Sequence, residues 1–483
     1  MNVLEKIVVD KRIEVAQREI NFPLESFIDQ LTVSDRDFKQ ALIDDKQNKG
    51  AAYIFECKKA SPSKGLIREV FDLNEICQAY SQYASCVSVL TDEKYFQGEF
   101  ERLPLVRSKL PQPVLCKDFF VEPYQVYLAR HFGGNAILLM LSVLDDETYI
   151  RLDTVAKELG MHVLTEVSNR EEMERAVALN CDILGINNRN LRDLSTDLNQ
   201  TPMLVDLFKT LADKKQQDNT VLISESGIYN HGQIMSLNKH VDGYLVGSSL
   251  MAQKDLEKAC RELVNGQHKV CGITQSEDAI AIAKAGASFG GLIFVESSKR
   301  CVTPEQAKDI ISETQEVINL PFVAVVRNKT INDLVRLISQ VPVSALQLHG
   351  DEDQNYIDEL REALSQVGKN IEIWQVVSVP VDGKLPAQWP QADRILLDTV
   401  TPDGTQGGSG ITFSWQNLTS LPLDIAPIML AGGLNPQNIN DAIQLPINGV
   451  DLNSGVETSP GIKNKELVQQ CFDIINRKHS LQS

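Results

Sequence analysis

A pattern of two apolar strand-like segments that end in glycine and serine occurs twice in this chain. In the first copy, residues 221–227 read VLISESG and residues 243–249 read GYLVGSS. In the second copy, residues 428–433 read IMLAGG and residues 449–455 read GVDLNSG. Backbone N–H groups at such strand ends can approach an anion closely, and two successive ends of this kind are typical of the last two strands of a (β/α)8 barrel. The two copies therefore predict two barrels and two phosphorylated ligands.

The length and composition of the chain are compatible with two such barrels. Its 483 residues are close to twice the ~250 residues of a typical barrel, and 43% of them are hydrophobic, as in an ordinary globular protein. The net charge of −18 provides no basic field, so we expect no nucleic acid and no anionic membrane surface as a partner. Local groups must therefore hold an anionic small substrate.

The cysteines and the N-terminus predict a soluble protein of the cytoplasm. The nine cysteines form no CxxC pair and no zinc-type spacing. Cys86, Cys116 and Cys181 lie in apolar runs, where reduced thiols behave as small hydrophobic groups. The N-terminus has no apolar signal segment, and no stretch approaches the roughly 18 apolar residues of a membrane span.

The first half alternates short apolar runs with helical patterns, which indicates repeated βαβ units. An earlier segment carries Leu4, Ile7, Val8, Val15 and Ala16 at rough helical spacing. We predict that this segment forms helices that precede the barrel and could cover part of its mouth. The eight strands of the barrel are expected to end at Cys57, Leu90, Cys116, Leu141, Glu166, Asn187, Ser224 and Val246.

The second half shows the same alternation of short apolar runs and helical patterns. Between the halves, a helical run over residues 255–264 gives way to the polar link NGQHK at residues 265–269, where the glycine is typical of a helix C-terminus. We place the domains at residues 1–262 and 266–483, closely tethered because no long linker intervenes. The predicted fold is α/β, with two tandem (β/α)8 TIM barrels. The strands of the second should end near Gly272, Val295, Val326, Leu348, Val377, Leu397, Leu430 and Leu452.

Charged and polar residues recur at the predicted C-terminal strand ends of the first half, where a barrel carries its chemistry. Glu56 and Lys58 are two residues apart on one strand, so their side chains project to the same face. A single pair of this kind is most often a structural ion pair at the barrel rim. Several strand ends that converge instead predict an enclosed site. Its residues are Glu56, Lys58, Lys117, Asp118, Glu166, Asn187, Arg189, Glu225, Ser226, Gly247 and Ser248.

At these positions the first half resembles the indole-3-glycerol-phosphate synthases, and the resemblance covers roughly residues 1–262. It is carried by FECKKASPSKG at 55–65, CKDF at 116–119, LTEV at 164–167, INNRNL at 186–191 and SESG at 224–227. The second half resembles the phosphoribosylanthranilate isomerases. That resemblance is carried by VCGIT at 270–274, QLHG at 347–350, LLDT at 396–399, GGSG at 407–410, AGGLNP at 431–436 and SGVE at 454–457. The whole chain is similar to bifunctional bacterial enzymes that carry these consecutive steps of tryptophan biosynthesis.

For the first domain, the resemblance implies closure of 1-(2-carboxyphenylamino)-1-deoxyribulose 5-phosphate to indole-3-glycerol phosphate, with loss of CO2 and water. Lys117 fits the acid that polarises the ketone, and Glu166 fits the base or proton shuttle. Lys58, held by Glu56, could share the acid role, and the sequence leaves open which lysine acts at which step. Substrate binding is expected from Ser61, Phe119, Asn187, Arg189, Glu225 and Ser226, and phosphate binding from Ser61, Gly227, Gly247 and Ser248.

For the second domain, the resemblance implies an Amadori rearrangement, in which an acid opens a furanose ring and a base removes the C2 proton. An isolated cysteine at a strand end is more often a buried hydrophobic residue than a reagent. Cys271, however, stands directly before GIT at 272–274, and Asp398 stands at another strand end. This arrangement favours Cys271 as the thiolate base and Asp398 as the acid.

The remaining candidates of the second domain bind substrate. Arg300 fits a substrate carboxylate or phosphate, with a solvated loop arginine as the alternative. His349 could line the site or be a hydrogen-bonded structural histidine. The sequence departs from the family pattern at Lys299, where proline is usual, and at Ile411 and Asn453. The loop at 407–410 lies where the family surrounds its substrate. Phosphate binding is expected from Gly432, Gly433, Ser454 and Gly455.

Neither reaction needs a cofactor, and the sequence shows no GxGxxG helix opening, no P-loop and no metal-ligand cluster. We therefore expect no cofactor and no metal. A monomer is favoured because both activities already share one chain. Three alternatives remain open at this point: barrels with another phosphosugar chemistry, one inactive scaffold domain, and a phosphate-binding module without catalysis.

Overall fold

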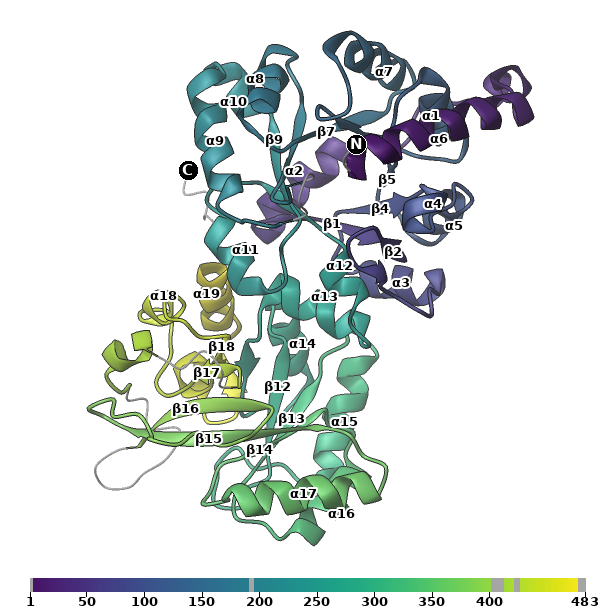
Figure 1. Ribbon diagram of the computed structural model, residues 1–483. Helices are drawn as coiled ribbons and strands as arrows, with labels where there is room; N and C mark the ends of the chain where they lie inside the picture. Colours follow the sequence, from purple (N-terminus) through teal and green to yellow (C-terminus); the bar gives the residue numbers. More distant parts are fainter. Residues whose placement is uncertain (1–2, 191–194, 401–411, 421–425, 477–483) are drawn as a thin grey trace. The chain divides into compact units, whose positions relative to one another are not determined.

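The computed structural model describes residues 3–190, 195–400, 412–420 and 426–476, except for the side chains of residues 419 and 420. The chain divides into two compact units, Met1–Val264 and Asn265–Ser483. Each unit contains a closed barrel of eight parallel strands (Figure 1). The prediction of two tandem (β/α)8 barrels is confirmed. Within the described residues, no helix combines the length and apolar character that crossing a membrane would require.

The first barrel closes where β1 pairs with both β4 and β10. A short hairpin of β2 (Ala60–Ser61) and β3 (Gly65–Leu66) follows the first strand. The barrel strands are β1 (Ala52–Cys57), β4 (Cys86–Leu90), β5 (Val114–Lys117), β6 (Ala136–Met140), β7 (His162–Val167), β8 (Ile183–Asn187), β9 (Val221–Glu225) and β10 (Gly243–Val246).

The predicted N-terminal helices are present before the first barrel, as α1 (Val3–Asn21) and α2 (Phe38–Lys49), with the 3-10 turns η1 (Leu24–Ser26) and η2 (Ile28–Gln30) between them. Asp37 accepts a hydrogen bond from the Gln40 N–H and thereby begins α2. Phe38 and Leu42 of α2 are fully buried in the core inside the barrel, with the first residues of several strands. This helix therefore closes the N-terminal end of the barrel.

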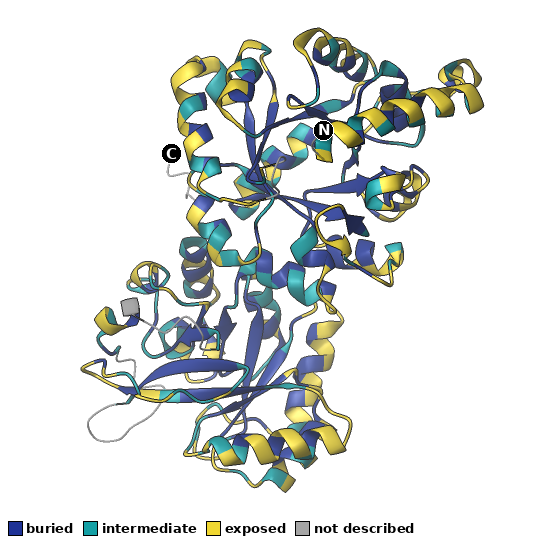
Figure 2. Cartoon of the chain, in the orientation of Figure 1, coloured by how far each residue is buried: buried dark blue, intermediate teal, exposed yellow. Residues whose placement is uncertain are grey.

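The other helices of the first unit mostly cover the outer faces of its strands, with buried residues on their inward faces (Figure 2). Most begin at a capping aspartate or asparagine, such as Asp145 and Asn169. They are α3 (Leu73–Tyr80), α4 (Glu93–Phe96), α5 (Arg102–Lys109), α6 (Pro123–His131), α7 (Asp146–Glu158), α8 (Arg170–Ala178), α9 (Gln200–Leu211), α10 (Lys214–Asn219), α11 (His231–Leu237), α12 (Ser248–Met251) and α13 (Leu256–Asn265).

The second barrel runs in sequence order from β11 to β18 and closes by pairing these two strands. Trp374 is fully buried in the core inside the barrel. The strands are β11 (Lys269–Val270), β12 (Phe289–Ile293), β13 (Phe322–Val326), β14 (Ala345–Leu348), β15 (Glu372–Pro380), β16 (Arg394–Val400), β17 (Ile428–Leu430) and β18 (Gly449–Leu452). Its helices are α14 (Ser276–Ala285), α15 (Pro304–Gln315), α16 (Ile331–Gln340), α17 (Gln354–Gln366), α18 (Ile439–Ala442) and α19 (Lys465–Ile475), with η3 (Trp415–Ser420) and η4 (Ser454–Val456).

Two strands of the second barrel extend beyond the ends predicted from the sequence. β15 continues past Val377 to Pro380, and β16 continues past Leu397 to Val400. The two strands pair with each other along this extension, with Pro380 opposite Val400. Mutual pairing satisfies their backbone groups, which the apolar pattern of either strand alone does not reveal. After η4, the short hairpin of β19 (Glu457–Ser459) and β20 (Ile462–Lys463) leads into α19.

Candidate active sites

Strand alternation places charged side chains inside the C-terminal end of the first barrel. On β1, Ile54 belongs to the core inside the barrel, whereas Phe55 packs in the core between strands and helices. The same alternation directs Glu56 inward at the end of the strand. On three further strands, an inward-facing leucine or isoleucine is followed two residues later by a charged residue near the strand end. These charged residues are Lys117, Glu166 and Glu225.

Three of these side chains form one largely buried chain of ion pairs together with Lys58. Lys58 Nζ lies 2.5 Å from Glu56 Oε1. Lys117 Nζ lies 3.0 Å from Glu56 Oε2 and 3.3 Å from Glu225 Oε2. Glu56 and Glu225 are each 1% exposed, so solvent screens these pairs little. The structure thus brings together both predicted lysines and two of the predicted glutamates.

Burial and pairing move the pKa values of this site in opposite directions. Burial would raise the pKa of Glu56, but the ammonium groups of Lys117 and Lys58 lower it to about 2. Burial and the negative charge of Glu225 raise the pKa of Glu166 above its usual range. The pKa values of the two lysines also shift in opposite directions. Burial lowers the pKa of Lys58, whereas in Lys117 the carboxylates of Glu56 and Glu225 outweigh burial and raise the pKa.

Two glycines make room for these carboxylates. A Cβ atom on Gly247 would lie 2.3 Å from Glu56 Oε1, and one on Gly185 would lie 1.9 Å from Glu225 Oε1. Any larger residue at either position would displace a charged side chain. Gly247, a predicted phosphate-binding residue, therefore also has a steric role that the sequence did not reveal.

One cavity at this end of the barrel gathers nearly all residues predicted for the first site. The exception is Glu225, which pairs with the lining residue Lys117. Arg189 is half-buried and donates a hydrogen bond to Ser63 Oγ at 2.8 Å. The predicted residues in the lining are Glu56, Lys58, Ser61, Lys117, Asp118, Phe119, Glu166, Asn187, Arg189, Ser226, Gly227, Gly247 and Ser248.

The same cavity has an apolar wall, of which the sequence predicted only a part. Phe119 was predicted, but Phe96 was not, because it lies on the four-residue helix α4 without a periodic pattern. The two rings lie with centroids 6.1 Å apart. The apolar spacing of α1 was recognised, and Leu4 and Ile7 of that helix indeed line the cavity. The prediction that N-terminal helices cover part of the mouth is confirmed for α1.

In the second barrel, Cys271 lies directly after β11 and is 5% exposed. Burial raises the pKa of its thiol, and the nearby ammonium of Lys269 acts in the opposite direction. Lys269 is fully buried and forms an ion pair with Asp451 at the facing position of β18. Sequence reasoning missed this pair, although Lys269 stands two residues before Cys271, the same spacing that singled out Glu56 and Lys58.

Asp398 lies on β16 with His349 beside it. The His349 Nε2 atom is 3.5 Å from Asp398 Oδ2. Burial raises the pKa of Asp398 to about 6, while burial and the charges of Lys269 and Arg327 lower the pKa of His349 to about 4. His349 is therefore neutral near pH 7. Because Lys269 acts on Cys271, Asp398 and His349 alike, the predicted acid and base share one charged neighbourhood.

Arg300 does not lie free in solvent. Its Nε and Nη2 atoms donate to the Glu457 carboxylate at 2.9 and 2.7 Å, and Lys463 Nζ contacts the same carboxylate at 2.6 Å. A Cβ atom on Gly272 would lie 2.6 Å from Arg300 Cδ, which places the arginine against the residue next to Cys271. The solvated-loop alternative for Arg300 is wrong, because the guanidinium is tied into this network.

The predicted phosphate-binding glycines of the second barrel lie at close backbone approaches. Gly432 has φ +86°, and a Cβ atom there would lie 2.9 Å from Asp398 Oδ1. A Cβ atom on Gly455 would lie 2.0 Å from the Leu434 carbonyl oxygen, so the loop of Gly432 and Gly433 meets that of Ser454 and Gly455. The predicted loop 407–410 and Ile411 lie outside the described residues.

Comparisons with known proteins assign a family to each of the two barrels. Residues 4–263 match the family model described as indole-3-glycerol phosphate synthase, and residues 268–474 match that of N-(5'phosphoribosyl)anthranilate (PRA) isomerase.

Three relatives that match nearly the whole of this chain are described as tryptophan biosynthesis protein TrpCF. The protein from Vibrio cholerae is 50% identical over 97% of this chain and 95% of its own, and that from Haemophilus influenzae is 49% identical over 98% and 97%. The TrpCF of Salmonella typhi is 49% identical over 98% of this chain and 99% of its own. This chain therefore belongs to the TrpCF family of bifunctional tryptophan-biosynthesis enzymes, with an indole-3-glycerol-phosphate synthase domain followed by a phosphoribosylanthranilate isomerase domain.

Proposed function

We propose that the two barrels act in the reverse of their order along the chain. The second barrel converts N-(5-phosphoribosyl)anthranilate into 1-(2-carboxyphenylamino)-1-deoxyribulose 5-phosphate, and the first barrel closes this product to indole-3-glycerol phosphate. The observation that carries this proposal is that each barrel holds a buried acid–base set with displaced pKa values at the C-terminal end of its strands.

In the synthase reaction, the ring carbon that bears the carboxylate attacks the substrate ketone. A C–C bond forms, and negative charge develops on the ketone oxygen. Lys117 is suited to stabilise this charge because Glu56 and Glu225 keep its ammonium protonated. Loss of CO2 then restores the aromatic ring and leaves a hydroxyl group on the former ketone carbon.

Dehydration requires a proton for the leaving hydroxyl and a base for the neighbouring carbon. Lys58 fits the donor, because its lowered pKa makes it a stronger acid than an ordinary lysine. Glu166 fits the base, because its raised pKa makes its carboxylate a stronger base than an ordinary glutamate. We therefore divide the two lysines between the steps, with Lys117 at condensation and Lys58 at dehydration.

Different residues of the synthase site would bind the two ends of the substrate. Ser61, Gly227, Gly247 and Ser248 would hold the phosphate, while Asn187 and Ser226 would orient the polar middle. The aromatic ring would lie against the apolar wall of the cavity, which Phe96, Phe119, Leu4 and Ile7 provide.

In the isomerase reaction, Asp398 would protonate the furanose ring oxygen, so that the C–O bond breaks and a cationic imine forms. Its raised pKa of about 6 leaves more of Asp398 protonated at neutral pH than an ordinary aspartate, so that it can donate this proton. Cys271 would then remove the C2 proton, and the resulting enol amine gains a proton at C1 and loses its hydroxyl proton to give the product ketone. Burial favours the thiol form of Cys271 before substrate binds, so the thiolate depends on Lys269 and on the positive charge of the imine.

Anion binding in the isomerase site would come from Gly432, Gly433, Ser454 and Gly455 for the phosphate, and from Arg300 for the substrate carboxylate. His349, neutral beside Asp398, would orient that acid. Glu457 holds the Arg300 guanidinium by two of its nitrogens, which fixes its position before substrate arrives.

We also propose that the two domains, residues 1–262 and 266–483, fold and act independently, and that the enzyme is a cytoplasmic monomer. Each unit has a closed sheet and its own buried core, which supports independence. Eight of the nine cysteines are buried free thiols, as expected in a reducing compartment.

The direct test follows both steps with the purified chain, without added metal or nucleotide. Phosphoribosylanthranilate should be consumed and indole-3-glycerol phosphate should accumulate. Supplying the open-chain carboxyphenylamino-deoxyribulose phosphate instead tests the synthase alone. Binding of either compound without turnover would contradict the corresponding half of the proposal.

A further inference from the structure

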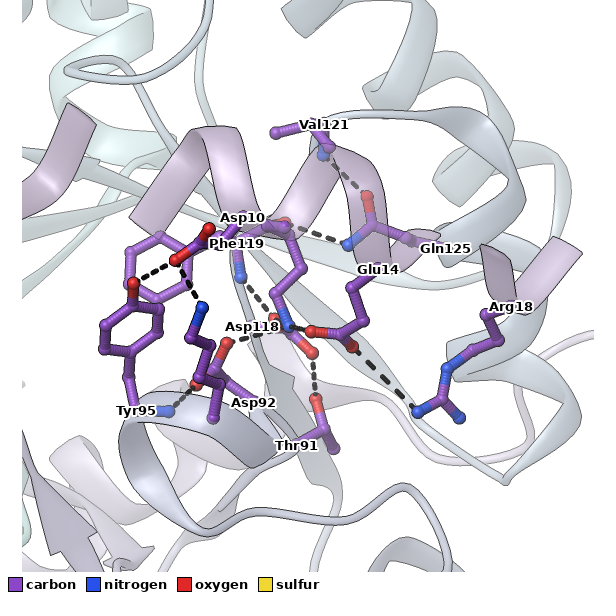
Figure 3. Close-up of polar contacts among 12 residues, drawn as sticks. Asp10, Glu14, Arg18, Thr91, Asp92, Tyr95, Asp118, Phe119, Val121 and Gln125 are labelled. Atoms are coloured by element: carbon purple, nitrogen blue, oxygen red, sulfur yellow. Dashed lines mark hydrogen bonds and ion pairs between the residues drawn. The ribbon is translucent and has the colours of Figure 1, made fainter. Parts of the chain in front are cut away.

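A buried lysine on the N-terminal helix belongs to neither proposed acid–base set. Lys11 lies within α1, and 1% of its side chain is exposed. Its Nζ atom lies 2.8 Å from Glu14 Oε2, 2.8 Å from Asp92 Oδ2 and 2.9 Å from Asp118 Oδ1. Figure 3 shows these three carboxylates directed toward one point from separate parts of the first unit.

The ion pairs of Lys11 are strong enough to keep it charged. Burial would lower the pKa of its ammonium, but the carboxylates of Asp118, Asp92 and Glu14 outweigh burial and raise it. Asp92 and Asp118 are 1% and 3% exposed, so removal of the ammonium would leave two buried carboxylates side by side. Such a change costs far more than the loss of a surface ion pair.

Each of the two aspartates also fixes a turn that carries one phenylalanine of the cavity wall. Asp92 accepts a hydrogen bond from the Tyr95 N–H at 2.7 Å and begins α4, which ends at Phe96. Asp118 follows Lys117 directly and accepts a hydrogen bond from the Phe119 N–H at 2.7 Å.

Other contacts hold the same two turns. Asp118 accepts a second hydrogen bond, from the Thr91 hydroxyl, at 2.7 Å. Gln125 donates to the Phe119 carbonyl at 2.9 Å and accepts from the Val121 N–H at 2.8 Å (Figure 3). Asp10 of α1 also pairs with Lys94 of α4 at 2.8 Å. The helix and the two turns thus form one connected polar assembly with Lys11 at its centre.

We propose that Lys11 is a positioning residue of the synthase reaction. By pairing with Asp92 and Asp118, it holds α1 against the ends of β4 and β5, so that Leu4 and Ile7 meet Phe96 and Phe119 at the spacing that the aromatic ring of the substrate requires. This inference rests on the proposed synthase function. Lys11 itself does not line the cavity; it acts through the side chains that do.

The proposal makes different predictions for the two ends of the substrate. The assembly around Lys11 supports the apolar wall, whereas the proposed phosphate-binding residues belong to β2, to the loop after β9 and to the start of α12. Loss of Lys11 should therefore weaken binding of the aromatic end and leave the phosphate end intact. General destabilisation of the barrel would weaken both.

The experiment compares Lys11→Met with Lys6→Met in the full-length chain. Lys6 is an exposed lysine of the same helix, so its replacement removes one charge without opening the buried cluster. The synthase kcat and KM are measured with the open-chain substrate, and inorganic phosphate is titrated as a competitive inhibitor of that reaction. We expect Lys11→Met to raise KM and lower kcat/KM by roughly 10–100-fold, the scale for misplaced substrate, with little change in the phosphate inhibition constant. Lys6→Met should match the unmodified chain.

Turnover by the unmodified chain is measured first, and its absence would contradict the proposed function itself. An unchanged KM in Lys11→Met would overturn the role of Lys11 alone, as would a parallel loss of substrate and phosphate affinity. If Lys11→Met fails to fold, Asp92→Asn decides the question. Asparagine can still begin α4 but removes one charge that Lys11 pairs with. A raised KM with unchanged phosphate inhibition would support the proposal, and a normal KM would overturn it.

Discussion

The two barrels of this chain set the protonation of their candidate catalytic groups in different ways. In the synthase barrel, direct ion pairs in a chain of alternating charges outweigh burial and set the direction of the pKa shift at Glu56 and Lys117. In the isomerase barrel, burial is the largest influence on Cys271 and Asp398, and a separate pair, Lys269 with Asp451, supplies the nearby charge. One fold therefore holds candidate acid–base groups whose pKa shifts are decided by ion pairs in one barrel and by burial in the other.

The sharpest test of this contrast is Lys117→Met. This change removes the proposed electrophile and leaves Glu56 and Glu225 without their shared partner, so synthase turnover should fall by roughly 10²–10⁴-fold or more. The isomerase activity of the same molecules should stay nearly intact, and both rates are measured on one preparation. Far-UV circular dichroism checks that the first barrel has folded. Normal synthase turnover would remove Lys117 from the mechanism.

The matching test in the second barrel is Cys271→Ser, with Asp398→Asn beside it. Serine keeps the size of cysteine but replaces a thiol with an ordinary pKa near 8.5 by a hydroxyl that hardly ionises, so proton abstraction should fail. Asparagine cannot donate the proton that opens the ring. Each variant should lose roughly 10²–10⁴-fold of isomerase turnover, the range for a lost acid or base group. Each should still convert the open-chain intermediate to indole-3-glycerol phosphate.

Unchanged isomerase rates in Cys271→Ser would show that Cys271 is a buried hydrophobic residue and not the base. Equal loss of both activities would show that the substitution damaged the whole chain. The electrostatic difference between the barrels predicts that neither variant alters the synthase pH profile.

A smaller effect should follow from Glu225→Gln, which tests coupling within the synthase cluster. The base Glu166 must be ionised, so synthase activity should fall as the pH drops through its raised pKa. Removing the negative charge of Glu225 lowers that pKa, and the acidic limb of kcat/KM should move to lower pH by roughly half to one unit. The isomerase pH profile serves as the control. A shift to higher pH would contradict the coupling.

The smallest effect is expected from separating the barrels. Expressed as residues 1–262 and 266–483, each fragment should retain one activity with kinetic constants close to those of the full chain. Assays with each barrel's own substrate would check this. If neither fragment folds, or if each needs the other for activity, the two barrels do not function independently.

Much of the architecture and of the candidate sites followed from local patterns. The apolar runs predicted sixteen strands in two barrels, and the alternation along β1 predicted that Glu56 and Lys58 share a face. Local patterns did not single out Phe96, which lies on a single-turn helix, or Lys11, which lies among exposed charges of α1. The pairing of Lys269 with Asp451 could not be predicted from local patterns, because the two residues lie 182 positions apart in the sequence.

The sequence by itself determined which residues stand at the strand ends of each barrel, because a strand's side chains alternate with a period that depends only on the local backbone. Tertiary structure alone decided which charges meet there. Lys117 lies between Glu56 and Glu225, and Lys11 lies between Asp92 and Asp118, through contacts that span much of the domain. Desolvation and Coulomb interactions act through space, so the opposite pKa shifts of Lys58 and Lys117 could not be inferred from two lysines at strand ends.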